Sequence, residues 1–103
     1  MVKNQTYIKF DGIMFSGIEF GQHDLRFSSF KQCLMIGCDF ENADLRGADF
    51  SFASLQRADF SRAIIDETTV FENATFENTK VTQQQHLYLE KWTKTGLVVV
   101  DNQ

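Results

Sequence analysis

A period of five residues runs through most of this sequence. A large apolar residue returns at every fifth position from Phe10 to Val70. The residue two places earlier is alanine or cysteine through the middle of the chain. Five matches neither the 3.6-residue period of a helix nor the two-residue period of a strand. A fixed repeat of this kind predicts a repeat architecture, in which each unit buries its apolar side chains only by stacking on its neighbours.

Residues twenty positions apart in this series are chemically alike, which indicates four repeats to each coil. Two sets are aromatic and one is aliphatic: Phe10, Phe30 and Phe50; Phe20, Phe40 and Phe60; Leu25, Leu45 and Ile65. We therefore expect coils that stack like on like, with the central apolar residue and the small residue pointing inward. The register slips by one residue at 66–69, so either Val70 or Phe71 takes the next inward position. One extra residue at a corner is typical of a bulge or a small loop.

The repeats resemble those of the pentapeptide-repeat family, whose unit is A(D/N)LXX. Residues 38–63 carry this unit as Cys-Asp-Phe, Ala-Asp-Leu, Ala-Asp-Phe, Ala-Ser-Leu and Ala-Asp-Phe at five-residue intervals. The resemblance implies an all-β fold, a right-handed quadrilateral parallel β-helix of about four coils. On this basis we expect a lead-in over residues 1–7, the β-helix over 8–81 and a separate C-terminal segment over 82–103.

The pattern changes after residue 81. Residues 82–92 read as an amphipathic helix with Thr82 as its N-cap, and Gly96 is a plausible stop before an aliphatic strand at 97–100. This order resembles the C-terminal tail of the Qnr and MfpA branch of the family. There the tail caps the β-helix and joins two copies tail to tail. The resemblance implies a homodimer, with an interface that contains Leu87, Leu89, Trp92, Leu97, Val98 and Val99.

The N-terminal end and the small inward positions carry larger or more reactive side chains. Isoleucine occupies the small position at Ile8, Ile13 and Ile18, which we expect to seal the open N-terminal end in part. His23 follows in that series, and we expect it to point inward or to cap the end. Cys33 and Cys38 also occupy the small position. Buried free thiols are the expected state, because disulfides are uncommon in cytosolic proteins.

The sequence predicts no enzyme and no cofactor. It contains no glycine-rich phosphate loop, no His/Cys metal spacing and no Ser/His/Asp order, and its carboxylates fall at outward positions. The first residues lack the apolar region of a signal peptide, and no stretch is long enough to span a membrane. We therefore expect a cytoplasmic, non-enzymatic protein of bacterial type.

Acidic residues are distributed unevenly. Residues 39–77 hold nine acids and three bases, whereas residues 1–38 hold three acids and four bases. Glu19, Asp39 and Asp59 recur every twenty residues, so they form a column of like charges on one face, with Glu41 beside it. The next face carries Asp24 and Asp44, where Arg26 and Arg46 stand two residues later and can compensate.

Two interpretations of these acids remain open. Aspartate is the residue that the family prefers at this position, where it favours solubility. Alternatively, the acidic column mimics DNA, since the resemblance to Qnr and MfpA implies DNA gyrase and topoisomerase IV as targets and quinolone resistance as an outcome. A net charge of −4 argues against binding nucleic acid itself. The candidate partner-binding face comprises Glu19, Asp39, Glu41, Asp44 and Asp59.

The alternative function is a generic scaffold for protein–protein interaction with an unknown partner. Its candidate surface is the face on which Met14, Leu34 and Ile36 point outward, because exposed apolar clusters often mark contacts. Phe27 and Phe52, also at outward positions, extend this surface or pack at corners.

Overall fold

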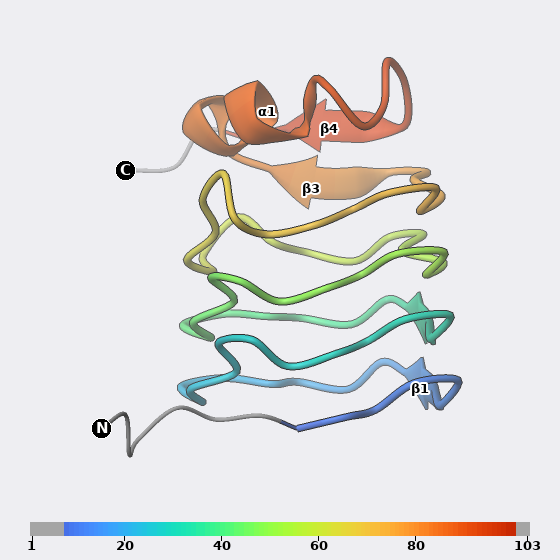
Figure 1. The fold of residues 1–103 in the computed structure, drawn as a ribbon. Helices are drawn as coiled ribbons and strands as arrows, with labels where there is room; N and C mark the ends of the chain where they lie inside the picture. The colour runs from blue at the N-terminus through green and yellow to red at the C-terminus, as the bar shows by residue number, and fades with distance from the viewer. Residues whose placement is uncertain (1–7, 101–103) are drawn as a thin grey trace.

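The computed structural model describes residues 8–100, in which the backbone winds upward in stacked coils (Figure 1). Its regular elements are β1 (Met14–Ser16), β2 (Leu34–Ile36), β3 (Thr79–Val81), α1 (Gln83–Leu89) and β4 (Leu97–Val99). β1 pairs with β2 in parallel, and so does β3 with β4. Isolated parallel bridges join the other coils. The one helix of this region is far too short to cross a membrane.

The bridges and the β1–β2 pairing define four faces, because partners lie twenty residues apart, as the sequence pattern predicted. We name three of these faces. The Met14 face comprises Met14, Leu34, Ser54 and Thr75. The acidic face comprises Glu19, Asp39, Asp59 and Lys80, and the arginine face comprises Asp24, Asp44 and Ile64 with the neighbouring Arg26 and Arg46. The remaining face carries Lys9, Ser29, Asp49 and Val70.

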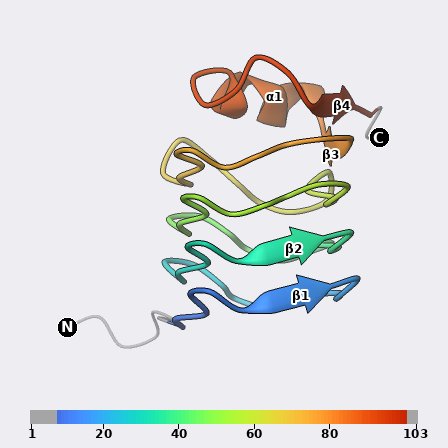
Figure 2. The same ribbon diagram turned by 90° about the vertical axis from the view of Figure 1, so that its right-hand side faces the viewer.

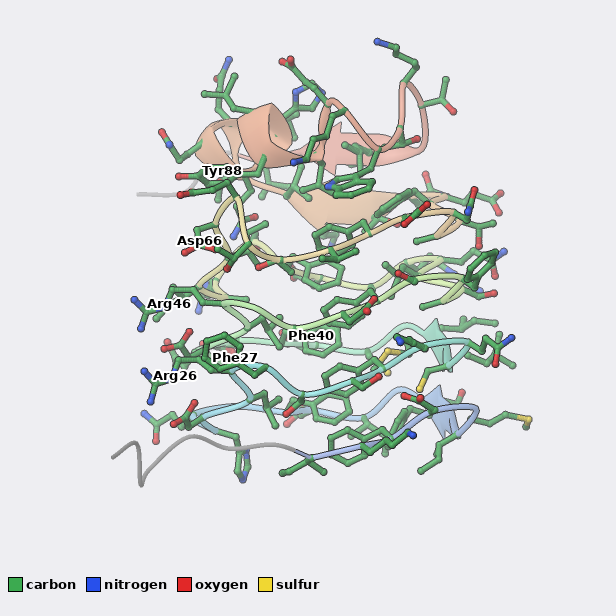
Figure 3. All side chains as sticks on the ribbon, in the orientation of Figure 1. Arg26, Phe27, Phe40, Arg46, Asp66 and Tyr88 are labelled. Carbon is green, nitrogen blue, oxygen red and sulfur yellow. The ribbon has the colours of Figure 1, made fainter. Side chains whose placement is uncertain are left out.

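The core consists of the inward apolar residues, which stack in the predicted columns. The rings of Phe40 and Phe60 are parallel within 7° at 4.8 Å between centroids, and Phe40 meets Phe50 edge to face at 5.7 Å. A spacing near 4.8 Å is that of neighbouring strands, so each ring rests on its counterpart in the next coil. Phe40 lies inside the stack in Figure 3. Four alanines and the two cysteines fill the small positions beside the rings with almost no exposed surface: Cys33, Cys38, Ala43, Ala48, Ala53 and Ala58.

At most corners the residue two places after the inward apolar residue has a positive φ. Glycine and asparagine suit this conformation, but Phe27 and Phe52 also adopt it, at φ 63° and 62°. Their side chains point outward and are 39% and 59% exposed, respectively. Phe27 lies against the next coil, because a Cβ added to Gly47 would meet the Phe27 ring at 2.6 Å.

The extra residue lies at the corner of Asp66–Thr68, and Phe71 rather than Val70 points inward. Phe71 is 1% exposed and its ring stacks on Phe50 at 5.3 Å, whereas Val70 pairs with Asp49 on an outer face. Thr69 then takes the small inward position, and its hydroxyl donates to the Leu45 carbonyl at 3.0 Å. Partners beyond this corner are therefore 21 residues apart instead of 20.

The two ends of the β-helix differ. At the N-terminal end Ile8, Ile13 and Ile18 remain 40%, 44% and 41% exposed, so the described residues leave this end largely open. His23 is also exposed at this end, with Nδ1 2.9 Å from the Phe20 carbonyl, so it is not buried in the core.

At the C-terminal end α1 lies across the last coil (Figures 1 and 2). Thr82 is its N-cap, as predicted, and forms a capping box with Gln85. The Gln85 amide donates to the carbonyls of Phe60 and Ala63, at 2.6 and 3.0 Å, so the helix is bonded to the coil beneath it. The helix ends at Leu89 rather than at residue 92, and β4 pairs with β3 after Gly96.

Candidate functional site

The acidic face brings three predicted carboxylates into one column. Glu19 is a bridge partner of Asp39, and Asp39 is a bridge partner of Asp59. Adjacent strands lie about 4.8 Å apart, so these side chains are close neighbours of like charge. Glu41 stands beside the column, and two shallow hollows of about 280 and 370 Å³ along this face are lined by the carboxylates of Asp39 and Glu41.

Lys80 completes the acidic column at its C-terminal end, and sequence reasoning missed it. Counting by twenty from Asp59 leads to Thr79, but the extra corner residue brings Lys80 into register instead. Thr79 points inward, and its hydroxyl donates to the Leu55 carbonyl at 2.7 Å. Glu41 is also partly neutralised, because Arg62 pairs with it at 2.8 Å. Within residues 8–100, no ion pair within 4.0 Å joins Glu19, Asp39 or Asp59 to a base.

The aspartates of the repeats share a structural role. Each accepts a hydrogen bond from the backbone N–H two residues later, at the start of the corner. The Glu41 N–H donates to Asp39 Oδ1 at 3.0 Å, and the Ser61 N–H donates to Asp59 Oδ1 at 2.9 Å. The same bond occurs at Asp24, Asp44, Asp49 and Asp66. This satisfies a corner N–H, which explains the recurrence of aspartate without any partner.

The arginine face carries the same aspartates in a different electrostatic setting. Arg26 donates from Nε and an Nη to the two oxygens of Asp24, both at 2.8 Å, and Arg46 binds Asp44 in the same bidentate way. The hydrogen bonds from Arg26 lower the pKa of Asp24 from its ordinary value of 3.8 to about 2. Those from Arg46 lower the pKa of Asp44 as well. Figure 3 shows Arg26, Arg46 and Asp66 along one edge of the stack.

Asp44 therefore does not join the other predicted acids. It lies on the arginine face, with its bridge partners Asp24 and Ile64, and Arg46 neutralises it. The candidate site that the structure supports is Glu19, Asp39 and Asp59, with Glu41 at the side.

The predicted dimer residues divide into two groups. Leu89 is fully buried against the last coil, so its place is in the protomer core and not at an interface. Trp92 and Leu97 are half-buried and pack against the same core. Leu87, Val98 and Val99 are 59%, 40% and 47% exposed, so they are available for contact.

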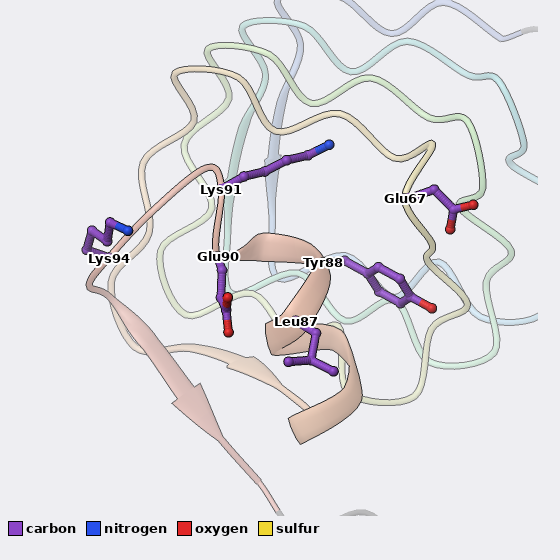
Figure 4. Close-up of a pocket in the computed structure, with 6 residues that line it drawn as sticks. All are labelled: Glu67, Leu87, Tyr88, Glu90, Lys91 and Lys94. Atoms are coloured by element: carbon purple, nitrogen blue, oxygen red, sulfur yellow. The ribbon is translucent and has the colours of Figure 1, made fainter.

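A hollow of about 340 Å³ lies on the C-terminal cap (Figure 4). Leu87, Tyr88 and Glu90 of α1 and its C-cap line it, together with Lys91, Lys94 and Glu67. Two carboxylates, two amines, one phenol and one aliphatic side chain thus surround it.

Reactive groups are sparse in the described part of the chain. Residues 8–100 hold no cluster of His, Cys, Asp and Glu that fits a metal ion. Cys33 and Cys38 are buried free thiols, as expected. The Cys33 thiol donates to the Phe10 carbonyl at 3.1 Å, and burial raises the pKa of both thiols.

Comparison with known proteins identifies the repeats. The family model of pentapeptide repeats matches residues 24–65 in eight copies. Residues 24–65 thus consist of pentapeptide repeats, as the A(D/N)LXX pattern implied. A search of curated proteins finds no match.

Two solved structures are similar to this chain. One is full-length QnrB1, a plasmid-mediated fluoroquinolone resistance protein, with 17% identity and a TM-score of 0.63 over 72% of this chain and 37% of QnrB1. The aligned part thus spans little more than a third of QnrB1, and the likeness is one of fold. The other is a pentapeptide repeat protein from the Arabidopsis thaliana thylakoid lumen, with 26% identity over 84% of this chain and 76% of that one, and a TM-score of 0.34.

Proposed function

We propose that this chain is a non-enzymatic binding protein whose acidic face docks on a basic, DNA-binding protein surface, that of a type II topoisomerase such as DNA gyrase or topoisomerase IV. The observation that carries the proposal is the in-register column of Glu19, Asp39 and Asp59, none of which forms an ion pair within 4.0 Å with a base of residues 8–100. Like charges stacked on a sheet are mildly destabilising, so solubility alone does not favour this arrangement.

The spacing of the column supports mimicry of a phosphate backbone. Carboxylates recur about every 4.8 Å along the stack, and a DNA strand carries one phosphate about every 3.4 Å of axis. A cationic surface built to follow DNA would meet a comparable density of negative charge. The corner hydrogen bonds to Asp39 and Asp59 fix these carboxylates without removing their charge.

The likeness to QnrB1 adds a precedent for the fold. QnrB1 is a fluoroquinolone resistance protein, and its fold resembles that of this chain. Quinolone protection by this shorter chain is accordingly part of the proposal.

We further propose that the functional unit is a dimer joined at the C-terminal cap. Leu87 of α1 and Val98 and Val99 of β4 are exposed, Trp92 and Leu97 are half-buried, and the β4 strand has a partner, β3, on one side only. A two-fold contact through this cap would bury these side chains and pair the open strand edge. Light scattering on the Leu87→Asp/Val99→Asp variant should then show a monomer where the wild type shows a dimer. A wild-type monomer at micromolar concentration would contradict the dimer.

A supercoiling assay tests the function. Wild-type chain and a Glu19→Gln/Asp39→Asn/Asp59→Asn variant are added to DNA gyrase with and without a quinolone. The amides keep the oxygen acceptors of the corner bonds and remove only the charge. We expect the wild type to inhibit supercoiling or to protect it from the drug, and the triple variant to lose this effect. No effect of the wild type at micromolar concentration would contradict the proposal.

A second candidate function, an interaction scaffold, is favoured by the Met14 face. Met14, the first residue of β1, is 75% exposed at a position where solvent normally favours polar residues. This function needs no topoisomerase and would persist if the acidic face proved inert.

A further inference from the structure

A groove crosses the corner between the Met14 face and the acidic face. It has a volume of about 590 Å³ and is lined by Ser16, Gly17, Ile36, Gly37, Arg57, Asn78 and Lys80. Figure 2 shows β1 and β2 one above the other, and this corner follows them along the chain.

Glycine creates the hollow. Gly17 and Gly37 occupy the same corner position in successive coils, with φ of 66° and 71°, and a Cβ added to either would meet nothing within 4 Å. The next two coils carry Arg57 and Asn78 at this position, with φ of 59° and 53°. The corner therefore has no side chain in the two N-terminal coils, and it carries polar side chains, Arg57 and Asn78, in the next two.

The two basic side chains of this groove form no ion pair within the described structure. Arg26, Lys31, Arg46 and Arg62 each pair with a carboxylate. Within residues 8–100, Arg57 is the one arginine that forms no ion pair within 4.0 Å, and Lys80, like Lys9, Lys91 and Lys94, forms none either, although the chain is acidic overall. Arg57 also adopts a left-handed backbone conformation that is uncommon for arginine, so local backbone preference does not account for its presence.

The lining of the groove contains one apolar side chain, which adjoins the Met14 face. Ile36 lines it, and Leu34, on the same outward side of β2, pairs with the exposed Met14 of β1. A ligand that fills the groove thus meets an aliphatic surface at one end and two cations at the other.

We propose that this corner groove binds a short acidic and apolar peptide segment of a partner protein. A carboxylate of the peptide pairs with the Arg57 guanidinium, whose planar fork suits bidentate binding, and with the Lys80 ammonium. An adjoining aliphatic side chain rests on Ile36 above the bare corner at Gly37. A nucleic acid is a poorer fit, since its phosphates would lie beside Asp39 and Asp59 of the neighbouring acidic face.

Selection from a phage-displayed library of random dodecapeptides, with the full chain as bait, tests the proposal. We expect enriched peptides that carry Asp or Glu next to Leu, Ile or Val. In fluorescence polarisation the best of them should bind at least about tenfold more weakly to Arg57→Gln, a factor of ten being about 1.4 kcal/mol. A version of the peptide with its acids changed to amides should lose binding to the wild type.

A glycine variant separates the groove from its charge. Gly37→Asn puts a side chain into the bare corner of the groove. The chain already places asparagine at the same left-handed corner position, at Asn42, Asn73 and Asn78. The Gly37→Asn variant should bind the peptide more weakly, as Arg57→Gln does. Gly12→Asn is the matched control, because Gly12 has a φ of 76° and open space around it but lies outside the groove.

Failure to enrich any acidic and apolar peptide would overturn the proposal. So would equal binding to wild type, Arg57→Gln and Gly37→Asn, or undiminished binding of the amide peptide. Both groove variants leave Glu19, Asp39 and Asp59 intact, so topoisomerase binding through the acidic face should survive them.

Discussion

The acidic face and the arginine face carry the same residue type at the same position of the repeat, yet they differ in charge. In both, an aspartate accepts the backbone N–H two residues later. On the arginine face that later residue is Arg26 or Arg46, which neutralises the aspartate, whereas on the acidic face it is Glu41 or Ser61. The aspartate thus serves the fold, and the residue two places later decides whether its charge remains available to a partner.

Both columns are held in register by one aromatic core, so the largest expected effect is a core truncation. Phe50→Ala should lower the free energy of unfolding by about 3–5 kcal/mol, because Phe50 is fully buried between two stacked rings. The exposed Phe52 is the control, and Phe52→Asn should change stability by no more than about 0.5 kcal/mol. Urea unfolding measures both. A Phe50→Ala variant as stable as the wild type would contradict the stacked core.

Adding charge should distinguish the two faces next. Lys80→Glu extends the acidic column by one carboxylate and removes its one base, so gyrase binding at low salt should tighten roughly fivefold or more. Ile64→Glu adds a carboxylate to the column of the arginine face, where Ile64 is 48% exposed, and should leave binding nearly unchanged. Surface binding at several salt concentrations checks both. Equal tightening by the two variants would show that net charge, not the acidic face, is recognised.

The shared corner bond should have a smaller cost. Asp59→Ala removes the two hydrogen bonds that the Ser61 N–H and hydroxyl donate to Asp59 and should destabilise the chain by about 1 kcal/mol. Asp59→Asn keeps an oxygen acceptor and should cost only a few tenths of that. Thermal unfolding of the two variants makes the comparison. Equal stability of Asp59→Ala and Asp59→Asn would mean that the corner bond contributes nothing.

The smallest effect concerns the ion pairs of the arginine face. Arg26 holds the pKa of Asp24 at about 2, below its ordinary value of 3.8. Since the pKa of the folded state is the lower one, the stabilisation is fully present above pH 4 and is lost as the pH falls through about 2. It amounts to less than about 1 kcal/mol, because the pair is exposed to solvent.

Arg26→Gln tests this pair directly. It should raise the pKa of Asp24 toward 3.8, which an NMR titration of the carboxyl carbon follows. Arg62→Gln is the control, because Arg62 pairs with Glu41 on the other face. An unchanged pKa of Asp24 in Arg26→Gln would contradict the assigned pairing.

The five-residue period was enough to predict the stacked coils and the inward residues, because core packing depends on side-chain size and spacing. The sequence after the repeats also predicted the N-cap at Thr82, since a capping residue is recognised from its immediate neighbours. It left Val70 and Phe71 open, because either side chain is apolar. Only the packing of Phe71 on Phe50 decides between them.

The same corner residue hid part of the candidate site. A shift of one residue exchanges inward and outward positions on a strand, so Lys80 and not Thr79 follows Asp59. Leu89 was assigned to the dimer interface because an apolar residue fits an interface and a cap equally. The position of the helix on the last coil buries it in the protomer. The predicted compensation of Asp24 and Asp44 by their arginines is confirmed, because spacing of two residues fixes both partners at one corner.

The most direct test of the central claim is calorimetric binding to DNA gyrase across a salt series. One variant removes the carboxylate charges of the acidic face (Glu19→Gln/Asp39→Asn/Asp59→Asn). A second removes the carboxylate charges of the arginine face and keeps its arginines (Asp24→Asn/Asp44→Asn). We expect the first to weaken binding by at least about tenfold and to flatten its salt dependence, because screened surface charges would carry the interaction. The second should bind like the wild type. Equal affinities for all three proteins, or no binding of the wild type at low salt, would contradict the account.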